Sequence, residues 1–485
     1  MPQTHQRVGC APERRPLPAH SETVLHAPRP LDYSPVAVFA GAGDAVAGFH
    51  AAAFALRSLA GPGHESAGDA AFGIVCSYGD AFGDAVASSA PGAGAGRVRD
   101  AGWAVRWVAS VRDCAIALSD AYWASCRAAD GSAPAAYRLR LASSAAEVVK
   151  WSACSRSRPP LDVWGRLAVL FTDAPESYGR LVGGDLPGIG REYLRAIAYH
   201  SAGLDQMVLD TALAACALID RALPFIELSR KKSLPLQYVV SPPDAPMPER
   251  RAGEPSSGAW HFQADAAGEL LRGFREALER GEVPAALAGQ PLPALHDAVE
   301  ALLRRWSADP PIRLRRRFPQ EAEIDVTHGF ENCLAVLDER ASISRQRCRT
   351  LDFSHSGLHF SMDLEPPGGW PDIGGLVAVH FVDGQGWQLG VVRRLGFGQP
   401  LTDLGIELIA RKPQAADLDD GRSPVRCILC DEVLKGELVR VVLPSDCEFV
   451  SERVFLRSVA GLFTLRKLQQ ELVERDYRIC TFQVL

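Results

Sequence analysis

Residues 303–327 read LRRWSADPPIRLRRRFPQEAEIDVT, and the hydrophobic period of the chain changes within this stretch. Upstream, apolar residues recur at three- and four-residue spacing, as in 293–306, which predicts amphipathic helices. Downstream, residues 322–327 alternate between apolar and polar, which predicts a strand. Pro310 and Pro311 stop the last helix. The sequence therefore predicts an α+β multi-domain protein, with an all-α helical N-terminal region followed by an antiparallel β domain.

Composition divides the helical region further. Residues 1–34 are rich in Pro, His and Arg without periodicity, and we expect them to be a disordered tail. Residues 35–240 have the pattern of a helical domain, and their tryptophans at helical spacing are predicted to pack in its core. Residues 241–258, rich in Pro, Glu, Arg and Ser, are predicted to be a linker, and residues 259–309 a helical connector.

The β domain is predicted over residues 310–412. Its later strands are expected at 376–382, 387–395 and 404–409, because each run is apolar and bounded by Gly, Pro or Asp. An apolar insert at 329–341 is expected to add a helical turn. The remaining residues, 413–485, are predicted to form a short αβ extension.

An arginine cluster stands at the entrance of the β domain, at Arg313, Arg315, Arg316 and Arg317. The planar guanidinium makes paired, charge-assisted bonds to phosphate or to the O6 and N7 atoms of guanine, and its flat face stacks on a base. Taken alone, a run of arginines is more often a solvated surface. Its place directly before the first strand makes this cluster a candidate anion-binding arm.

A second motif, DFSHSG at 352–357, follows a strand predicted to run through Leu351. Asp352 can accept hydrogen bonds from guanine N–H groups, Ser354 can donate to a phosphate oxygen, and Gly357 leaves room for close backbone approach. Taken alone, this spacing is also typical of an ordinary turn between strands. The two motifs together, in this order, favour a nucleotide site.

The two motifs and the strands after them resemble the PilZ domain, a bacterial β-barrel family with the signature RxxxR followed by [D/N]xSxxG. The likeness covers about residues 313–412 and includes QLGVVRRL at 388–395 and DLGIELIA at 403–410. The resemblance implies a six-stranded barrel that binds cyclic di-GMP, with a candidate site formed by Arg313, Arg316, Arg317, Asp352, Ser354 and Gly357.

The arm can be aligned with that signature in two registers. Arg313 and Arg317 form an intact RxxxR that is shifted by three residues from the usual position. The register that ends immediately before the first strand pairs Arg316 with Gln320, and glutamine keeps the hydrogen bonding but lacks the charge. Both registers remain open from the sequence.

Charge and hydropathy exclude several classes of partner. Lys and Arg number 52 against 58 Asp and Glu, and the net charge of -6 offers no general attraction for nucleic acid. The longest strongly apolar run, 211–219, is too short to span a bilayer, so we expect no membrane insertion. The first residues lack the apolar core of a secretory signal, and Ala, Gly and Arg are abundant. These features predict a cytoplasmic bacterial protein.

Catalytic and metal sites are not expected. Cys427 and Cys430 have CxxC spacing, but in a strand residues three apart face opposite sides, and two further ligands are missing. The sequence contains no GxSxG, Walker loop or HExxH motif. We therefore expect a protein that is not an enzyme and has no cofactor.

The predicted function is that of a signalling protein. It would bind cyclic di-GMP and relay occupancy to a protein partner through the helical region. The alternative is an adaptor whose PilZ-like barrel binds other proteins and no nucleotide.

Overall fold

The structure is a computed structural model. It describes residues 38–39, 44–60, 68–90, 103–128, 133–172, 180–183, 188–232, 237–242, 245–251, 259–307, 318–319, 321–338, 343–363, 373–382, 384, 386–397, 401–422, 424–447, 453–473 and 476–485. The expected tail, residues 1–34, lies outside the described residues.

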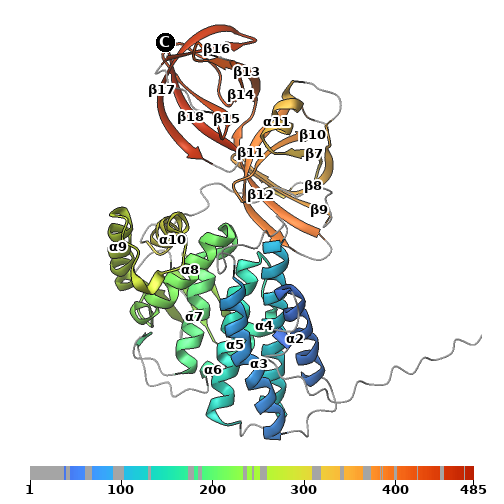
Figure 1. Cartoon of the computed structure of the whole chain (residues 1–485), viewed down its shortest axis with the longest axis vertical. Helices are drawn as coiled ribbons and strands as arrows, with labels where there is room; N and C mark the ends of the chain where they lie inside the picture. The colour runs from blue at the N-terminus through green and yellow to red at the C-terminus, as the bar shows by residue number, and fades with distance from the viewer. Residues whose placement is uncertain are drawn as a thin grey trace, which may run out of the picture.

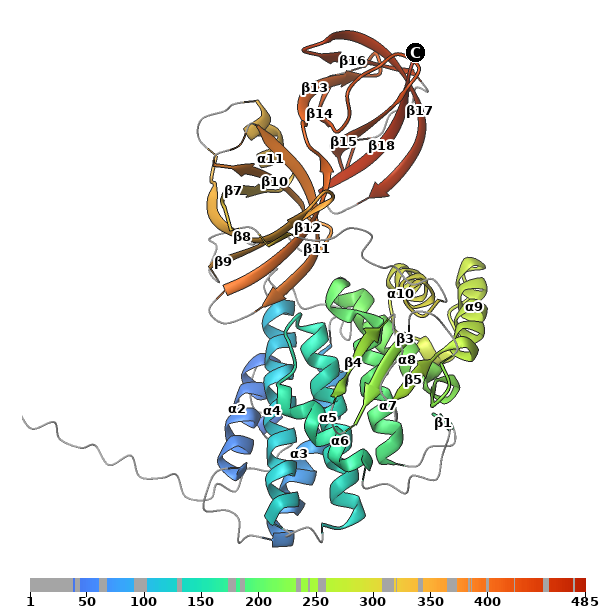
Figure 2. The ribbon, with the colours of Figure 1, turned by 180° about the vertical axis from the view of Figure 1, so that it is seen from behind.

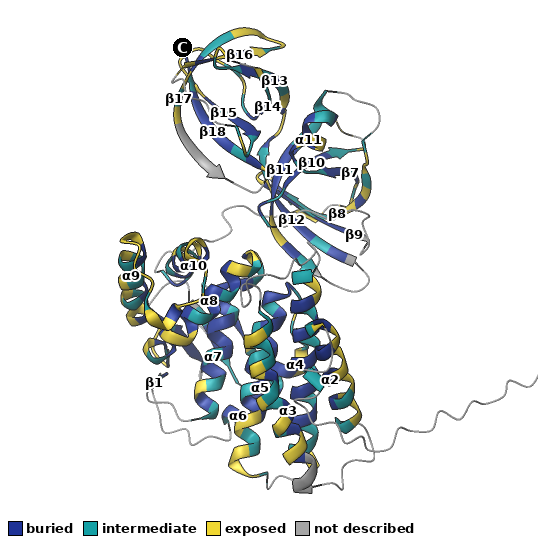
Figure 3. Cartoon of the chain, in the orientation of Figure 1, coloured by how far each residue is buried: buried dark blue, intermediate teal, exposed yellow. Residues whose placement is uncertain are grey.

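The helical region packs long helices side by side (Figure 1). Its α-helices are α2 (Ala45–Ala60), α3 (Gly68–Ser89), α4 (Trp103–Ala128), α5 (Ala135–Cys154), α6 (Leu161–Thr172), α7 (Ile189–Ala202), α8 (Leu209–Ala222), α9 (Asp265–Glu279) and α10 (Leu292–Arg305). Trp107, Trp151 and Trp164 are buried in one continuous core. The prediction that these tryptophans are core residues is therefore confirmed. Figure 3 shows buried segments along α4, α5 and α7.

A five-stranded antiparallel sheet corrects the prediction that this region is all α (Figure 2). Its strand order is β1 (Arg180–Val182), β2 (Glu227–Ser229), β5 (Trp260–Gln263), β3 (Gln237–Ser241) and β4 (Ala245–Arg251). Strands of three to seven residues are too short for alternation to stand out from the sequence. Strand β4 also lies in the segment 241–258 that was predicted to be a linker. It contains two prolines, which an edge strand tolerates, and it pairs only with β3.

The first barrel begins after the helical region, as predicted. Strands β7 (Glu323–His328), β8 (Gln346–Ser354), β9 (Gly357–Asp363), β12 (Leu401–Ala410), β11 (Trp387–Phe397) and β10 (Leu376–Phe381) pair antiparallel in that order, and β10 pairs with β7 to close the barrel. The short strand β6 (Phe318–Pro319) adds to the edge of β8 beside β7. Alternate residues such as Ile324, Val326 and Phe360 fill the interior.

Residues 414–484 form a second closed antiparallel barrel, which corrects the predicted αβ extension. Its strands in order are β13 (Gln414–Asp419), β14 (Pro424–Leu429), β15 (Leu438–Pro444), β18 (Tyr477–Val484), β17 (Gly461–Val473) and β16 (Arg453–Ser458). Residues 462–473 are rich in Leu, Lys, Gln and Glu, which favour helix. Pairing with β16 and β18 nevertheless holds them in a strand.

The two barrels share an apolar interface. The helix α11 (Phe330–Leu337), which confirms the expected helical insert, packs with β10 and β11 against Ile428, Val442 and Tyr477 of the second barrel. The buried Tyr477 hydroxyl donates to the carbonyl of Gly374 at 2.6 Å. The described parts of the two barrels therefore pack as one unit.

The described contact between the first barrel and the helical region includes a polar pair. Strand β11 lies against the short turn η1 (Leu204–Gln206), and the Arg394 guanidinium is 3.9 Å from the Asp205 carboxylate. Among the described helices, none combines the length and the apolarity that crossing a bilayer requires.

Candidate functional site

The DFSHSG motif forms the end of β8 and the turn into β9. Strand β8 runs to Ser354, three residues farther than predicted, and β9 begins at Gly357. Asp352 and Ser354 therefore lie within a strand and not in the turn. In the ladder, Asp352 is opposite His359 of β9.

Ser354 and Gly357 support the barrel itself. The Ser354 side chain is buried, and its hydroxyl donates to the Gly357 carbonyl at 3.4 Å. A Cβ at position 357 would lie 2.9 Å from the backbone oxygen of Ile406 on β12, closer than a Cβ normally approaches. This glycine is therefore required by strand packing, whereas the sequence suggested room for a ligand. To donate to a phosphate oxygen, the Ser354 hydroxyl would have to give up its hydrogen bond to the Gly357 carbonyl.

Asp352 is the motif residue that reaches the outer face of the barrel. A register shift between Thr350 and Asp352 marks a bulge in β8. The bulge turns both Arg349 and Asp352 outward, because it breaks the alternation of the strand once. The Asp352 carboxylate is 3.2 Å from Nδ1 of His359, and Nε2 of His359 is 3.9 Å from Asp403 on β12. A surface imidazole thus lies between two carboxylates.

His359 and Asp403 were not predicted as site residues. Each stands in a strand that alternates, so the sequence indicates that they face away from Phe360 and Leu404 in the core. Their proximity to Asp352 depends on the pairing of β9 with both β8 and β12. That register could not be predicted from the sequence.

The arginine arm, with Arg313, Arg316, Arg317 and Gln320, lies outside the described residues. Its covalent neighbour is described. Phe318 follows Arg317 directly, and in strand β6 it pairs with Phe353 while Pro319 pairs with Asp352. The rings of Phe318 and Phe353 are 6.1 Å apart between centroids. Pro319, two residues after Arg317, is therefore the pairing partner of Asp352.

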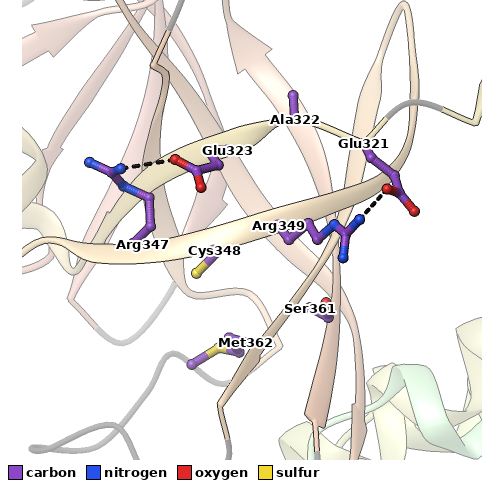
Figure 4. Close-up of a pocket in the computed structure, with 8 residues that line it drawn as sticks. All are labelled: Glu321, Ala322, Glu323, Arg347, Cys348, Arg349, Ser361 and Met362. Atoms are coloured by element: carbon purple, nitrogen blue, oxygen red, sulfur yellow. Dashed lines mark hydrogen bonds and ion pairs between the residues drawn. The ribbon is translucent and has the colours of Figure 1, made fainter. Parts of the chain in front are cut away.

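A pocket of about 580 Å³ lies among residues of β7, β8 and β9 and of the segment before β7 (Figure 4), and its lining residues are Glu321, Ala322, Glu323, Arg347, Cys348, Arg349, Ser361 and Met362. Arg347 bonds to Glu323 at 3.0 Å and to Asp325 at 2.7 Å. Arg349 forms an ion pair with Glu321. All four side chains that Figure 4 joins by dashed lines are more than half exposed. These two arginines share one face of β8 and are paired with carboxylates.

The two cysteines with CxxC spacing belong to different apolar clusters. Cys427 belongs to the apolar cluster inside the second barrel, whereas Cys430 belongs to the cluster between the barrels. Burial raises the pKa of the Cys427 thiol far above its usual value. No group of three or more His, Cys, Asp or Glu side chains within the described part of the chain is arranged to hold a metal ion.

The outer face of β8, β9 and β12 can therefore recognise hydrogen-bond donors through the carboxylates of Asp352 and Asp403. Binding of a phosphate there requires cations that are not already paired, whereas Arg347 and Arg349 on β8 are paired with carboxylates. Comparison of the sequence with protein-family models and with curated proteins found no match.

Proposed function

We propose that the first barrel binds cyclic di-GMP on the outer face of β8, β9 and β12, and that the chain is a cytoplasmic bacterial signalling protein related to the PilZ family. The single observation that carries this proposal is the β6–β8 pairing. In it Pro319, two residues after Arg317, pairs with Asp352, which supports a site that combines the arm with the DFSHSG motif.

The proposed binding mode divides the ligand between the strand and the arm. Asp352 accepts N–H groups of one guanine, and His359 holds the carboxylate in place from the opposite position of the ladder. Arginines of the arm supply the charge for the phosphates and stack on the bases. Ser354 and Gly357 keep the hairpin closed, and their contribution to binding is indirect.

The relay would act through the contact between the barrel and the helical region. Binding of a ligand by the arm would pull on the segment between β6 and α10, which ends at Arg305. Asp205, the partner of Arg394, belongs to the turn η1, and Arg305 at the end of α10 donates to Gln206 of the same turn. The helices would then present a changed surface to a partner protein.

A second candidate function is an adaptor that binds proteins without nucleotide. The observation that favours it is that Arg347 and Arg349, the described arginines on the outer face of β8, are already paired with carboxylates. A nucleotide would then depend on the arm alone for its positive charge.

Isothermal titration of the full chain with cyclic di-GMP tests the proposal. Arg317→Ala and Asp352→Asn should each weaken binding tenfold or more, since a charge-assisted bond is worth about 1.5 to 3 kcal/mol. Arg57→Ala, on the exposed side of α2, is the matched control and should leave the affinity unchanged. Absence of a binding isotherm for the unmodified chain would refute the proposal and favour the adaptor.

A third variant tests the register of the arm. Gln320→Arg should tighten binding if Arg316 and position 320 form the working pair. It should have little effect if Arg313 and Arg317 already clamp the ligand.

A further inference from the structure

The hairpin of β16 and β17 carries an unusual surface on the second barrel. Its strands pair from Arg453 opposite Arg466 to Ser458 opposite Gly461, with Val459 and Ala460 at the tip. The inward residues of both strands fill the barrel, so the alternate residues form one continuous outer face.

Positive charge gathers on this outer face, where three arginines point outward, namely Arg453, Arg457 and Arg466. Residues 453–470 contain no acidic side chain. The three arginines are exposed, and no carboxylate of the described residues forms an ion pair with them. Arg466 bonds only to the neutral amide oxygen of Gln483.

The carboxylates of the adjacent strand β13 offset only part of this charge. Asp417 lies opposite Arg457 but is ion-paired with Arg426 at 3.0 Å. Asp419, opposite Phe455, accepts a hydrogen bond from the backbone N–H of Gly421 at 2.7 Å. The hairpin face therefore keeps an excess of positive charge.

Large apolar side chains project from the same hairpin. Val459 at the tip is 87% exposed, Leu462 is 71% exposed and Phe455 is 47% exposed. The Ser458 hydroxyl accepts the N–H of Ala460 at 3.1 Å and so fixes the tip. Ordered apolar residues that project into water, with cations behind them, mark an interaction surface.

We propose that this hairpin docks on an anionic lipid surface, with Val459 and Leu462 inserted among the lipids and the arginines at the level of the headgroups. The arrangement fits a bilayer better than an acidic protein, because the apolar residues project at a narrow tip and do not form a flat patch. An interfacial contact needs no spanning helix. Figures 1 and 2 place β16 at the end of the molecule away from the helices, so docking leaves the helical region accessible.

Co-sedimentation of the full chain with vesicles tests this proposal. We expect binding to phosphatidylcholine vesicles that contain phosphatidylglycerol, little binding to phosphatidylcholine alone, and loss of binding at high salt. Each of Arg453→Gln, Arg457→Gln and Arg466→Gln should lower the partition coefficient about fivefold. Val459→Ser combined with Leu462→Ser should lower it about tenfold or more.

Matched controls lie in the helical region. Leu161→Ser removes an 88% exposed aliphatic side chain, and Arg57→Gln removes an exposed arginine; neither should alter vesicle binding. Val459→Trp gives a separate readout, since its fluorescence should shift to the blue on anionic vesicles only. Failure to bind anionic vesicles, equal binding to neutral ones, or equal losses in the controls would overturn the proposal. The proposal would also be overturned if the chain bound an acidic protein but did not bind vesicles.

Discussion

Replacement of Gly357 by alanine separates two roles for the glycine of the DFSHSG motif. The new Cβ would lie 2.9 Å from the Ile406 carbonyl oxygen, a backbone atom that cannot rotate away. Gly357 pairs with Glu407, and the N–H of Leu408 donates to Ser356 at 3.0 Å, so the strands are held on both sides of the clash. Separating β9 from β12 there should cost about 1 to 3 kcal/mol, the usual penalty for overpacking.

Urea-induced unfolding of the protein without ligand measures this effect. Gly357→Ala should lower the unfolding midpoint of the barrel transition. Gly273→Ala, in the middle of α9 with no atom within 4 Å of the added Cβ, should instead stabilise its region by about 0.5 to 1 kcal/mol. If Gly357→Ala left stability unchanged and removed only nucleotide binding, the strand-packing argument would be wrong and the glycine would serve the ligand.

Two further predictions concern the rest of the chain. Burial lowers the pKa of His200 below its ordinary value of 6.5, so the unfolded chain takes up a proton that the folded one resists. The helical region should therefore lose stability as the pH falls from 7 to about 5, and His200→Gln should flatten that dependence in urea titrations at several pH values. Tyr477→Phe should destabilise the paired barrels by about 1 kcal/mol, because the Gly374 carbonyl loses its buried donor. An unchanged midpoint for that variant would show that water replaces the hydroxyl.

The sequence predicted those helices and strands that are long enough to show a clear hydrophobic period. The change of period at Pro310 separates α10 from the first barrel, and the strands expected at 376–382, 387–395 and 404–409 correspond to β10, β11 and β12. The five-stranded sheet was missed because its strands are short and one of them contains prolines. The second barrel was missed in part because β17 is composed of residues that favour helix.

The candidate site was predictable only in its composition. The motif indicated Asp352, but the outward direction of its side chain depends on the bulge at Leu351. No residue type in β8 predicts that bulge. The neighbours His359 and Asp403 come from strands that are adjacent only in the folded barrel. The hydroxyl of Ser354 looked available for a ligand, whereas the closed hairpin uses it. Local residues thus specify which groups are present, and the register decides which of them meet.

The packing of the first barrel also decides where a ligand signal can travel. The first barrel is attached to the second barrel by a buried apolar cluster, by the Tyr477 hydrogen bond and by the ion pair between Arg426 and Asp338. Toward the helices, the described ion pair is Arg394 with Asp205 at 3.9 Å, and both side chains are partly exposed. Such a pair is worth about 0 to 1 kcal/mol, far less than the burial of an apolar interface. A change in the arm should therefore move the helical region against the two barrels together, and the joint at β11 and η1 is where hydrogen exchange should respond to the ligand.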